Sequence, residues 1–130
     1  MYDVSYMVKT VIIVDDESSI RYTVKQGLET LDQEFNVICV ENGAECLKLL
    51  KDNLVPDIIL LDIMMPEMNG WEIQKRLKDN MEWKSIPIIF LTATSDDTSK
   101  MIGSMLVEDY IGKPFEIKDL KVRIDKILRK

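Results

Sequence analysis

Acidic side chains stand where chemistry could occur, directly after two apolar runs of the sequence. Asp15 and Asp16 follow the run 10–14, and Asp62 follows the run 58–61. Carboxylates that lie close together repel one another and raise one another's pKa, and a bound divalent cation relieves that repulsion. Oxygen ligands select Mg²⁺ or Ca²⁺, and a site with few protein ligands, several waters and a phosphate suits Mg²⁺.

Two further polar residues end apolar runs in the same way. Thr92 follows 88–91, and Lys113 stands just after 110–111. Each residue alone has a plain structural explanation: the first two aspartates favour a helix start, Asp62 suits a turn, the threonine suits a strand, and the lysine suits a solvated surface. Their coincidence after separate apolar runs instead predicts one shared site.

The elements that must position these residues follow from the apolar pattern. Short β-branched runs predict strands at 10–14, 35–40, 57–61, 86–91 and 110–111. Helical periodicity predicts helices at about 18–31, 43–51, 70–78, 96–105 and 117–128. This (βα)5 alternation predicts a doubly wound α/β fold, with a parallel five-stranded sheet and helices on both faces. Ligands of such sheets bind beyond the carboxyl ends of the strands, where the polar residues above are expected.

Composition limits the classes of function. A chain of 130 residues fits one domain, with a core expected at about 9–129 and no output domain after the last helix. The net charge of −6 argues against nucleic-acid binding. No apolar run reaches the roughly 18 residues of a membrane span, and no signal peptide is evident, so we expect a cytoplasmic protein. The absence of histidine excludes histidine-based nucleophile schemes, and no glycine-rich phosphate loop is present.

Four segments together resemble response-regulator receiver domains of two-component signalling, over nearly the whole chain. The segments are VIIVDDE (11–17), PDIILLDIMMPEMNG (56–70), IIFLTA (88–93) and DYIGKPF (109–115). The resemblance is to single-domain, chemotaxis-regulator-like members. It implies a flavodoxin-like fold with strand order 2-1-3-4-5 and a phosphorylatable aspartate.

The resemblance also implies a role for each acidic residue. Asp62 is the expected phosphoacceptor. Asp15, Asp16 and Asp62 are expected to hold Mg²⁺ together with the backbone carbonyl of Met64, and Mn²⁺ is an expected substitute for Mg²⁺. Apart from catalysing its own phosphorylation and dephosphorylation, such a domain is not an enzyme.

Other positions carry expectations from the same resemblance. Lys113 is expected to pair with a phosphoryl oxygen, and the Thr92 hydroxyl to hydrogen-bond the phosphoryl group. Thr92 and Tyr110 are the expected switch residues. The residues expected to shape loops at the site are Pro66, Gly70 and Pro114, the last after a cis Lys113–Pro114 bond.

The expected partners follow as well. A sensor histidine kinase or a phosphotransfer protein is the expected phosphodonor, and a downstream protein is the expected target. The face formed by the fourth helix, fifth strand and fifth helix should change on phosphorylation, and a homodimer through that face is possible. We expect no nucleic acid and no membrane as partner.

Some residues depart from the family pattern. Leu106–Val107 replace a usual Gly-Ala pair, so we expect the end of the fourth helix and the following loop, which are part of the output face, to be bulkier than in relatives. Met64 and Thr94 occupy positions that tune phosphoryl lifetime, and a large apolar Met64 could slow hydrolysis by shielding the acyl phosphate from water. Two alternatives stay open: a receiver-like binding module that is never phosphorylated, and a flavin carrier on the same fold.

Overall fold

A parallel sheet of five strands forms the centre of the molecule in the computed structural model, which describes residues 8–93 and 108–129. The strand order is β2-β1-β3-β4-β5. The strands are β1 (Lys9–Val14), β2 (Phe35–Val40), β3 (Ile58–Asp62), β4 (Ile88–Ala93) and β5 (Asp109–Lys113). All neighbouring pairs are parallel, which confirms the expected sheet and its order.

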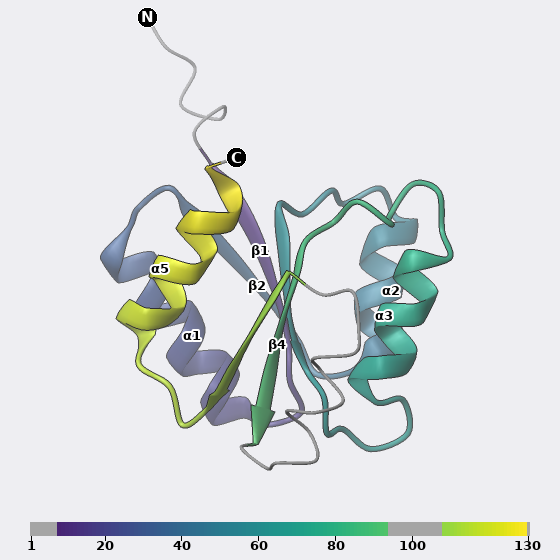
Figure 1. The fold of residues 1–130 in the computed structure, drawn as a ribbon, viewed down its shortest axis with the longest axis horizontal. Helices are drawn as coiled ribbons and strands as arrows, with labels where there is room; N and C mark the ends of the chain where they lie inside the picture. Colours follow the sequence, from purple (N-terminus) through teal and green to yellow (C-terminus); the bar gives the residue numbers. More distant parts are fainter. Residues whose placement is uncertain (1–7, 94–107, 130) are drawn as a thin grey trace, which may run out of the picture.

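Helices cover both faces of this sheet, as Figure 1 shows. They are α1 (Ser18–Leu31), α2 (Gly43–Lys51), α3 (Gly70–Lys78) and α5 (Ile117–Leu128). α1 and α5 lie on one face, and α2 and α3 lie on the other. The helix expected at 96–105, and Thr94 and Leu106–Val107, lie outside the described residues. Within the described ranges, no helix has the length and apolar character needed to cross a membrane.

The core consists of two apolar layers, one on each side of the sheet. Successive residues of β3 alternate between them: Ile59 and Leu61 join the layer under α2 and α3, whereas Ile58 and Leu60 join the layer under α1 and α5. All of these side chains are fully buried. A strand buried on both faces has no polar alternation, which is why the sequence shows a continuous apolar run here.

Two side chains of α1 bind the outer edge of β2 at Val37. Lys25 Nζ donates a hydrogen bond to the Val37 carbonyl at 2.8 Å, and Glu29 Oε2 accepts one from the Val37 N–H at 2.9 Å. The two side chains also form an ion pair at 2.9 Å. An edge strand exposes unpaired backbone groups to other chains, and this pair occupies both groups of Val37.

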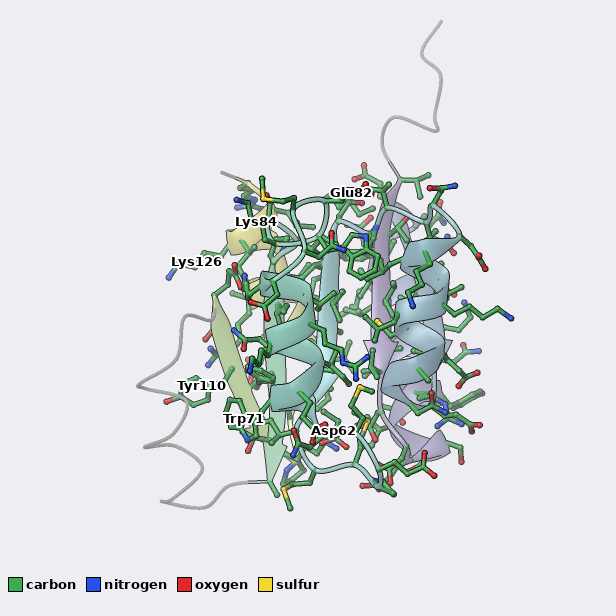
Figure 2. The ribbon with its side chains drawn as sticks, turned by 90° about the vertical axis from the view of Figure 1, so that its right-hand side faces the viewer. Asp62, Trp71, Glu82, Lys84, Tyr110 and Lys126 are labelled. Atoms are coloured by element: carbon green, nitrogen blue, oxygen red, sulfur yellow. The ribbon has the colours of Figure 1, made fainter. Side chains whose placement is uncertain are left out.

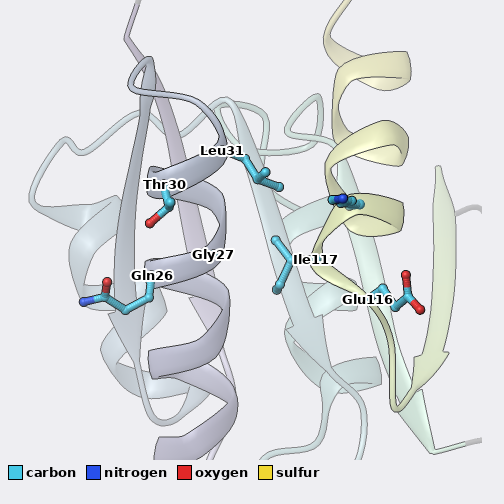
Figure 3. A pocket seen from close by; sticks show the side chains of 7 residues that line it. Gln26, Gly27, Thr30, Leu31, Glu116 and Ile117 are labelled. Atoms are coloured by element: carbon cyan, nitrogen blue, oxygen red, sulfur yellow. The ribbon is translucent and has the colours of Figure 1, made fainter.

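A glycine lets α1 and α5 approach each other closely. A Cβ on Gly27 would lie 2.7 Å from Cγ1 of Ile117, closer than side-chain carbons approach one another. Beside this contact lies a surface hollow of about 520 Å³, seen in Figure 3. It is lined by Gln26, Gly27, Thr30, Leu31, Glu116, Ile117 and Lys118. None of the predicted site residues lines this hollow.

Candidate functional site

Three carboxylates meet at the carboxyl ends of two adjacent central strands. β1 ends at Val14 and β3 at Asp62, so Asp15, Asp16 and Asp62 reach the same edge of the sheet. One oxygen from each carboxylate lies within 4.8 Å of the others. Figure 2 shows Asp62 at this end of the sheet, with Glu82 and Lys84 at the opposite end. The sequence therefore identified the cluster correctly.

Asp15 is the fully buried member of the cluster. Its Oδ1 accepts a hydrogen bond from the Glu17 N–H at 2.9 Å, and its Oδ2 accepts one from Lys113 Nζ at 2.8 Å. Its own N–H donates to the Val40 carbonyl at 3.2 Å. Asp16, in contrast, is exposed, so one acid is fixed by the protein and its neighbour faces solvent.

Lys113 comes from the end of β5 and reaches across the sheet to both buried acids. Its Nζ lies 3.4 Å from Asp62 Oδ1 in addition to the bond with Asp15. Burial lowers the pKa of this ammonium, but the hydrogen bond and charge of Asp15 and the charge of Asp62 outweigh burial, and the pKa is raised. The Lys113–Pro114 peptide bond is cis, as expected from the sequence.

Asp62 is nearly fully buried, and its pKa is raised to about 6. Burial is the largest cause, and the charge of Asp15 adds to it. Lys113 and a hydrogen bond from the Met64 N–H at 3.3 Å act in the opposite direction. The raised pKa therefore reflects burial of the carboxyl group first and the neighbouring charge of Asp15 second. A hard divalent cation fits such a set of carboxylate oxygens.

Thr92 and Tyr110, the expected switch pair, have different surroundings. Thr92 is buried at the end of β4, one residue beyond Leu91, which pairs with Asp62 across the sheet. Its Oγ1 donates a hydrogen bond to the Ala93 carbonyl at 3.0 Å. Tyr110 is 41% exposed, and its side chain points away from the sheet in Figure 2. Thr92 is therefore buried near the acidic edge of the sheet, whereas Tyr110 lies at the surface of β5.

The loop after β3 folds back tightly onto Asp62. The Gly70 N–H donates to the Ile63 carbonyl at 2.9 Å, and a Cβ on Gly70 would lie only 2.6 Å from the Asp62 carbonyl oxygen. Only glycine fits there, which gives a physical reason for the expected importance of Gly70. Pro66 accepts a hydrogen bond from the Met68 N–H at 2.8 Å, which closes a three-residue turn.

Two residues at the site were not identified from the sequence. Glu67, inside that turn, has a φ of 67°, a left-handed conformation that side-chain-bearing residues rarely adopt. Arg21, on α1, donates through Nη1 to the Asp15 carbonyl at 2.8 Å. Glutamate carries no turn signal, and an arginine in a helix resembles any surface arginine. Nothing in the local sequence could have distinguished either residue.

Comparison with known proteins agrees with this geometry. The family model described as response regulator receiver domain matches residues 11–125. The chain is 36% identical over 120 residues to "Histidine kinase P4" of Formosa agariphila, covering 92% of this chain and 8% of the kinase. It is 36% identical over 121 residues to "Transcriptional regulatory protein CpxR" of Escherichia coli (strain K12), covering 92% of this chain and 49% of CpxR.

A solved structure gives the same result in three dimensions. The response regulator receiver domain protein (CheY-like) of Methanospirillum hungatei JF-1 superposes with a TM-score of 0.79 at 38% identity, covering 93% of this chain and 94% of that one. The chain spans less than half of the two curated relatives above. The flavin-carrier alternative finds no support in these matches. The sheet order, the acidic edge and the family match together establish that this chain belongs to the receiver domains of two-component response regulators, a family of phosphoacceptors that switch partners on phosphorylation.

Proposed function

We propose that Asp62 of this chain is the phosphoacceptor, and that the donor is a phosphohistidine on a sensor histidine kinase or a phosphotransfer protein. The observation that carries the proposal is the meeting of three carboxylates within 4.8 Å of one another, with Lys113 Nζ bridging Asp15 and Asp62. An isolated surface aspartate would be a poor nucleophile for phosphorus. Here Lys113 supplies one positive charge beside Asp62, and the three carboxylates could hold a divalent cation that would supply the rest of the positive charge that phosphoryl transfer needs.

The chemical step is an in-line displacement at phosphorus. A carboxylate oxygen of Asp62 forms the new O–P bond while the N–P bond to the donor histidine breaks, and the imidazole leaves with the electron pair of that bond. With its pKa at about 6, Asp62 is largely ionised at neutral pH and ready to attack. Lys113 and the Thr92 hydroxyl stabilise the charge on the phosphoryl oxygens, once Thr92 Oγ1 turns from the Ala93 carbonyl toward the phosphoryl group.

The acidic cluster supports a magnesium site as part of this proposal. Asp15, Asp16, Asp62 and the carbonyl of Met64 are the proposed ligands, and Mn²⁺ can replace Mg²⁺ because both accept octahedral oxygen sites. When bound, the cation neutralises charge on the acids and on the incoming phosphoryl oxygens. The protein residues then have two tasks. The acids hold the ion, and Lys113 compensates the negative charge of the site that the ion does not neutralise.

The proposed readout is a shift between two states of the surface. Thr92 moves toward the phosphoryl group, and Tyr110 turns inward to occupy the space that Thr92 leaves. The face made of β5, α5 and the segment 96–105, which lies outside the described residues, then presents a different surface to a target protein or to a second copy of the chain. Phosphorylation shifts the two populations only by its differential stabilisation of one state. We propose that this receiver domain acts in the cytoplasm.

Phosphorylation can be tested with a small acyl-phosphate donor. Wild-type protein, Asp62→Asn and Asp79→Asn would be incubated with acetyl phosphate and Mg²⁺, and intact masses measured. Asp79 is an exposed carboxylate at the end of α3 and serves as the matched control. We expect one phosphate-sized mass gain in wild type and Asp79→Asn, and none in Asp62→Asn or with EDTA. Equal gain in Asp62→Asn would disprove the assignment of Asp62.

A further inference from the structure

Arg21 holds the backbone that joins the two adjacent acids. It stands early in α1, and its guanidinium turns back toward the loop after β1. Nη1 donates to the Asp15 carbonyl oxygen at 2.8 Å, while Nη2 lies 4.0 Å from Oε2 of Glu41 in the loop after β2. Its side chain is 19% exposed, so the guanidinium lies largely within the protein.

The Asp15 carbonyl is the part of this residue that determines where Asp16 points. The peptide unit is planar, so fixing the direction of the carbonyl oxygen also fixes the nitrogen of Asp16 in the same plane. The rest of Asp15 is already held, by Val40 through its N–H, by Glu17 through Oδ1 and by Lys113 through Oδ2. In the part of the chain that the structure describes, Arg21 is the group that donates to the carbonyl.

We propose that Arg21 is a positioning residue for the magnesium site, and that it acts by locking the peptide between Asp15 and Asp16. The inference rests on the proposed function, because it assumes that these acids bind the ion. Asp16 is exposed, so its direction depends on this peptide more than on packing. Arg21 binds a backbone oxygen and leaves the carboxylate oxygens of the acids free for the ion.

The shape of the guanidinium suits this task better than an ammonium would. Arginine presents several donors in one rigid plane, so it can address the Asp15 carbonyl and Glu41 at the same time. It thereby bonds to the loop after β1 while lying within ion-pair distance of Glu41 in the loop after β2. Lysine has one charged nitrogen on a flexible stem and could replace the bond to the carbonyl, but not both contacts at the same time. A lysine variant should therefore restore part of the effect.

The test is the affinity for the ion itself, measured by isothermal titration calorimetry with MgCl₂ on wild type, Arg21→Gln, Arg21→Lys and Arg76→Gln. Arg76 is an exposed arginine on α3 and provides the control. We expect Arg21→Gln to bind Mg²⁺ about 10-fold more weakly, the range seen when groups that orient metal ligands are removed. Arg21→Lys should lie between Arg21→Gln and wild type, and Arg76→Gln should match wild type.

Phosphorylation by acetyl phosphate separates positioning from a general loss of structure. Because the acids, Lys113 and Asp62 remain in Arg21→Gln, its rate should come close to that of wild type at saturating Mg²⁺, with the loss confined to subsaturating Mg²⁺. A Mg²⁺ affinity in Arg21→Gln or Arg21→Lys equal to that of wild type overturns the inference. Should Arg21→Gln not fold in EDTA, the lysine variant alone decides. Failure of wild type itself to bind Mg²⁺ would instead refute the proposed metal site.

Discussion

Lys113 donates its short hydrogen bond to Asp15, at 2.8 Å, and not to the proposed phosphoacceptor Asp62, from which it lies 3.4 Å. Its first task in this state is therefore to compensate the buried Asp15. Pairing with a phosphoryl oxygen on Asp62 would use the same ammonium. One lysine thus links the stability of the unmodified site to the chemistry proposed for it.

Replacing this lysine should therefore cost stability as well as activity. In Lys113→Met, two buried carboxylates lose their cation, and we expect a loss of about 3 kcal/mol in the free energy of unfolding. Phosphorylation by acetyl phosphate should slow at least ~10-fold, because the phosphoryl charge is no longer compensated. Urea unfolding in EDTA at pH 7 measures the first effect. Lys84→Met, at the opposite end of the sheet, is the control and should leave both quantities unchanged.

Removing the charge of Asp62 should have the opposite effect on stability. Its pKa is raised from 3.8 to about 6 in the folded state, so the folded protein binds more protons than the unfolded chain between these values. The contribution of Asp62 to the stability of wild type therefore falls as pH rises from about 4 to 6 and stays reduced above that range.

Asp62→Asn does not show this loss of stability, because the asparagine side chain does not ionise. In EDTA at pH 8 we expect it to be about 1–3 kcal/mol more stable than wild type, on a scale of 1.36 kcal/mol per pKa unit. The difference should shrink toward zero as pH approaches 4. Urea unfolding of both proteins across this pH range measures it, and a difference that is constant with pH would contradict the proposed cause.

Met64 offers a test of phosphoryl lifetime. Its side chain is 70% exposed, two residues after Asp62, where it could cover an acyl phosphate from attacking water. If it does so, Met64→Ala should shorten the phosphoryl half-life several-fold, measured by loss of the phosphate mass after the donor is removed. Met81→Ala, a 79% exposed methionine elsewhere, is the control. An unchanged half-life in Met64→Ala would mean that the side chain does not shield the phosphate.

Gly70 gives a prediction from packing alone. In Gly70→Ala the new Cβ would meet the Asp62 carbonyl oxygen at 2.6 Å and the Ile63 Cα at 2.9 Å. Both are backbone atoms of β3 and the loop that follows it, so removing this clash requires movement of β3, the strand that carries Asp62. We expect a loss of about 1–3 kcal/mol by urea unfolding, together with slower phosphorylation. Wild-type stability in Gly70→Ala would show that the loop has more freedom than this close approach implies.

The sheet and the acidic cluster were predictable because each depends on a periodic or repeated signal. Continuous apolar runs identify strands buried on both faces, and the carboxyl ends of parallel strands meet at one edge. Asp15, Asp62 and Lys113 follow such runs directly. Their approach in space thus follows from the positions of the runs, as does the burial of Thr92.

Other parts of the site depend on backbone geometry that sequence patterns do not encode. The left-handed conformation of Glu67 and the bond from Arg21 to a carbonyl oxygen involve residue types that usually stand in helices or on surfaces. The outward position of Tyr110 and the bond of Thr92 to its neighbouring carbonyl could not be read from residue type either, because tyrosine and threonine side chains occur both buried and exposed in strands.

The occupied peptide groups of Val37 limit how another strand can associate with the edge of β2. Because Lys25 and Glu29 already saturate the peptide groups of Val37, a foreign strand cannot extend the sheet at that point without first displacing an ion pair. At Val37, contact with another protein would therefore involve the side chains of α1 before the backbone of β2.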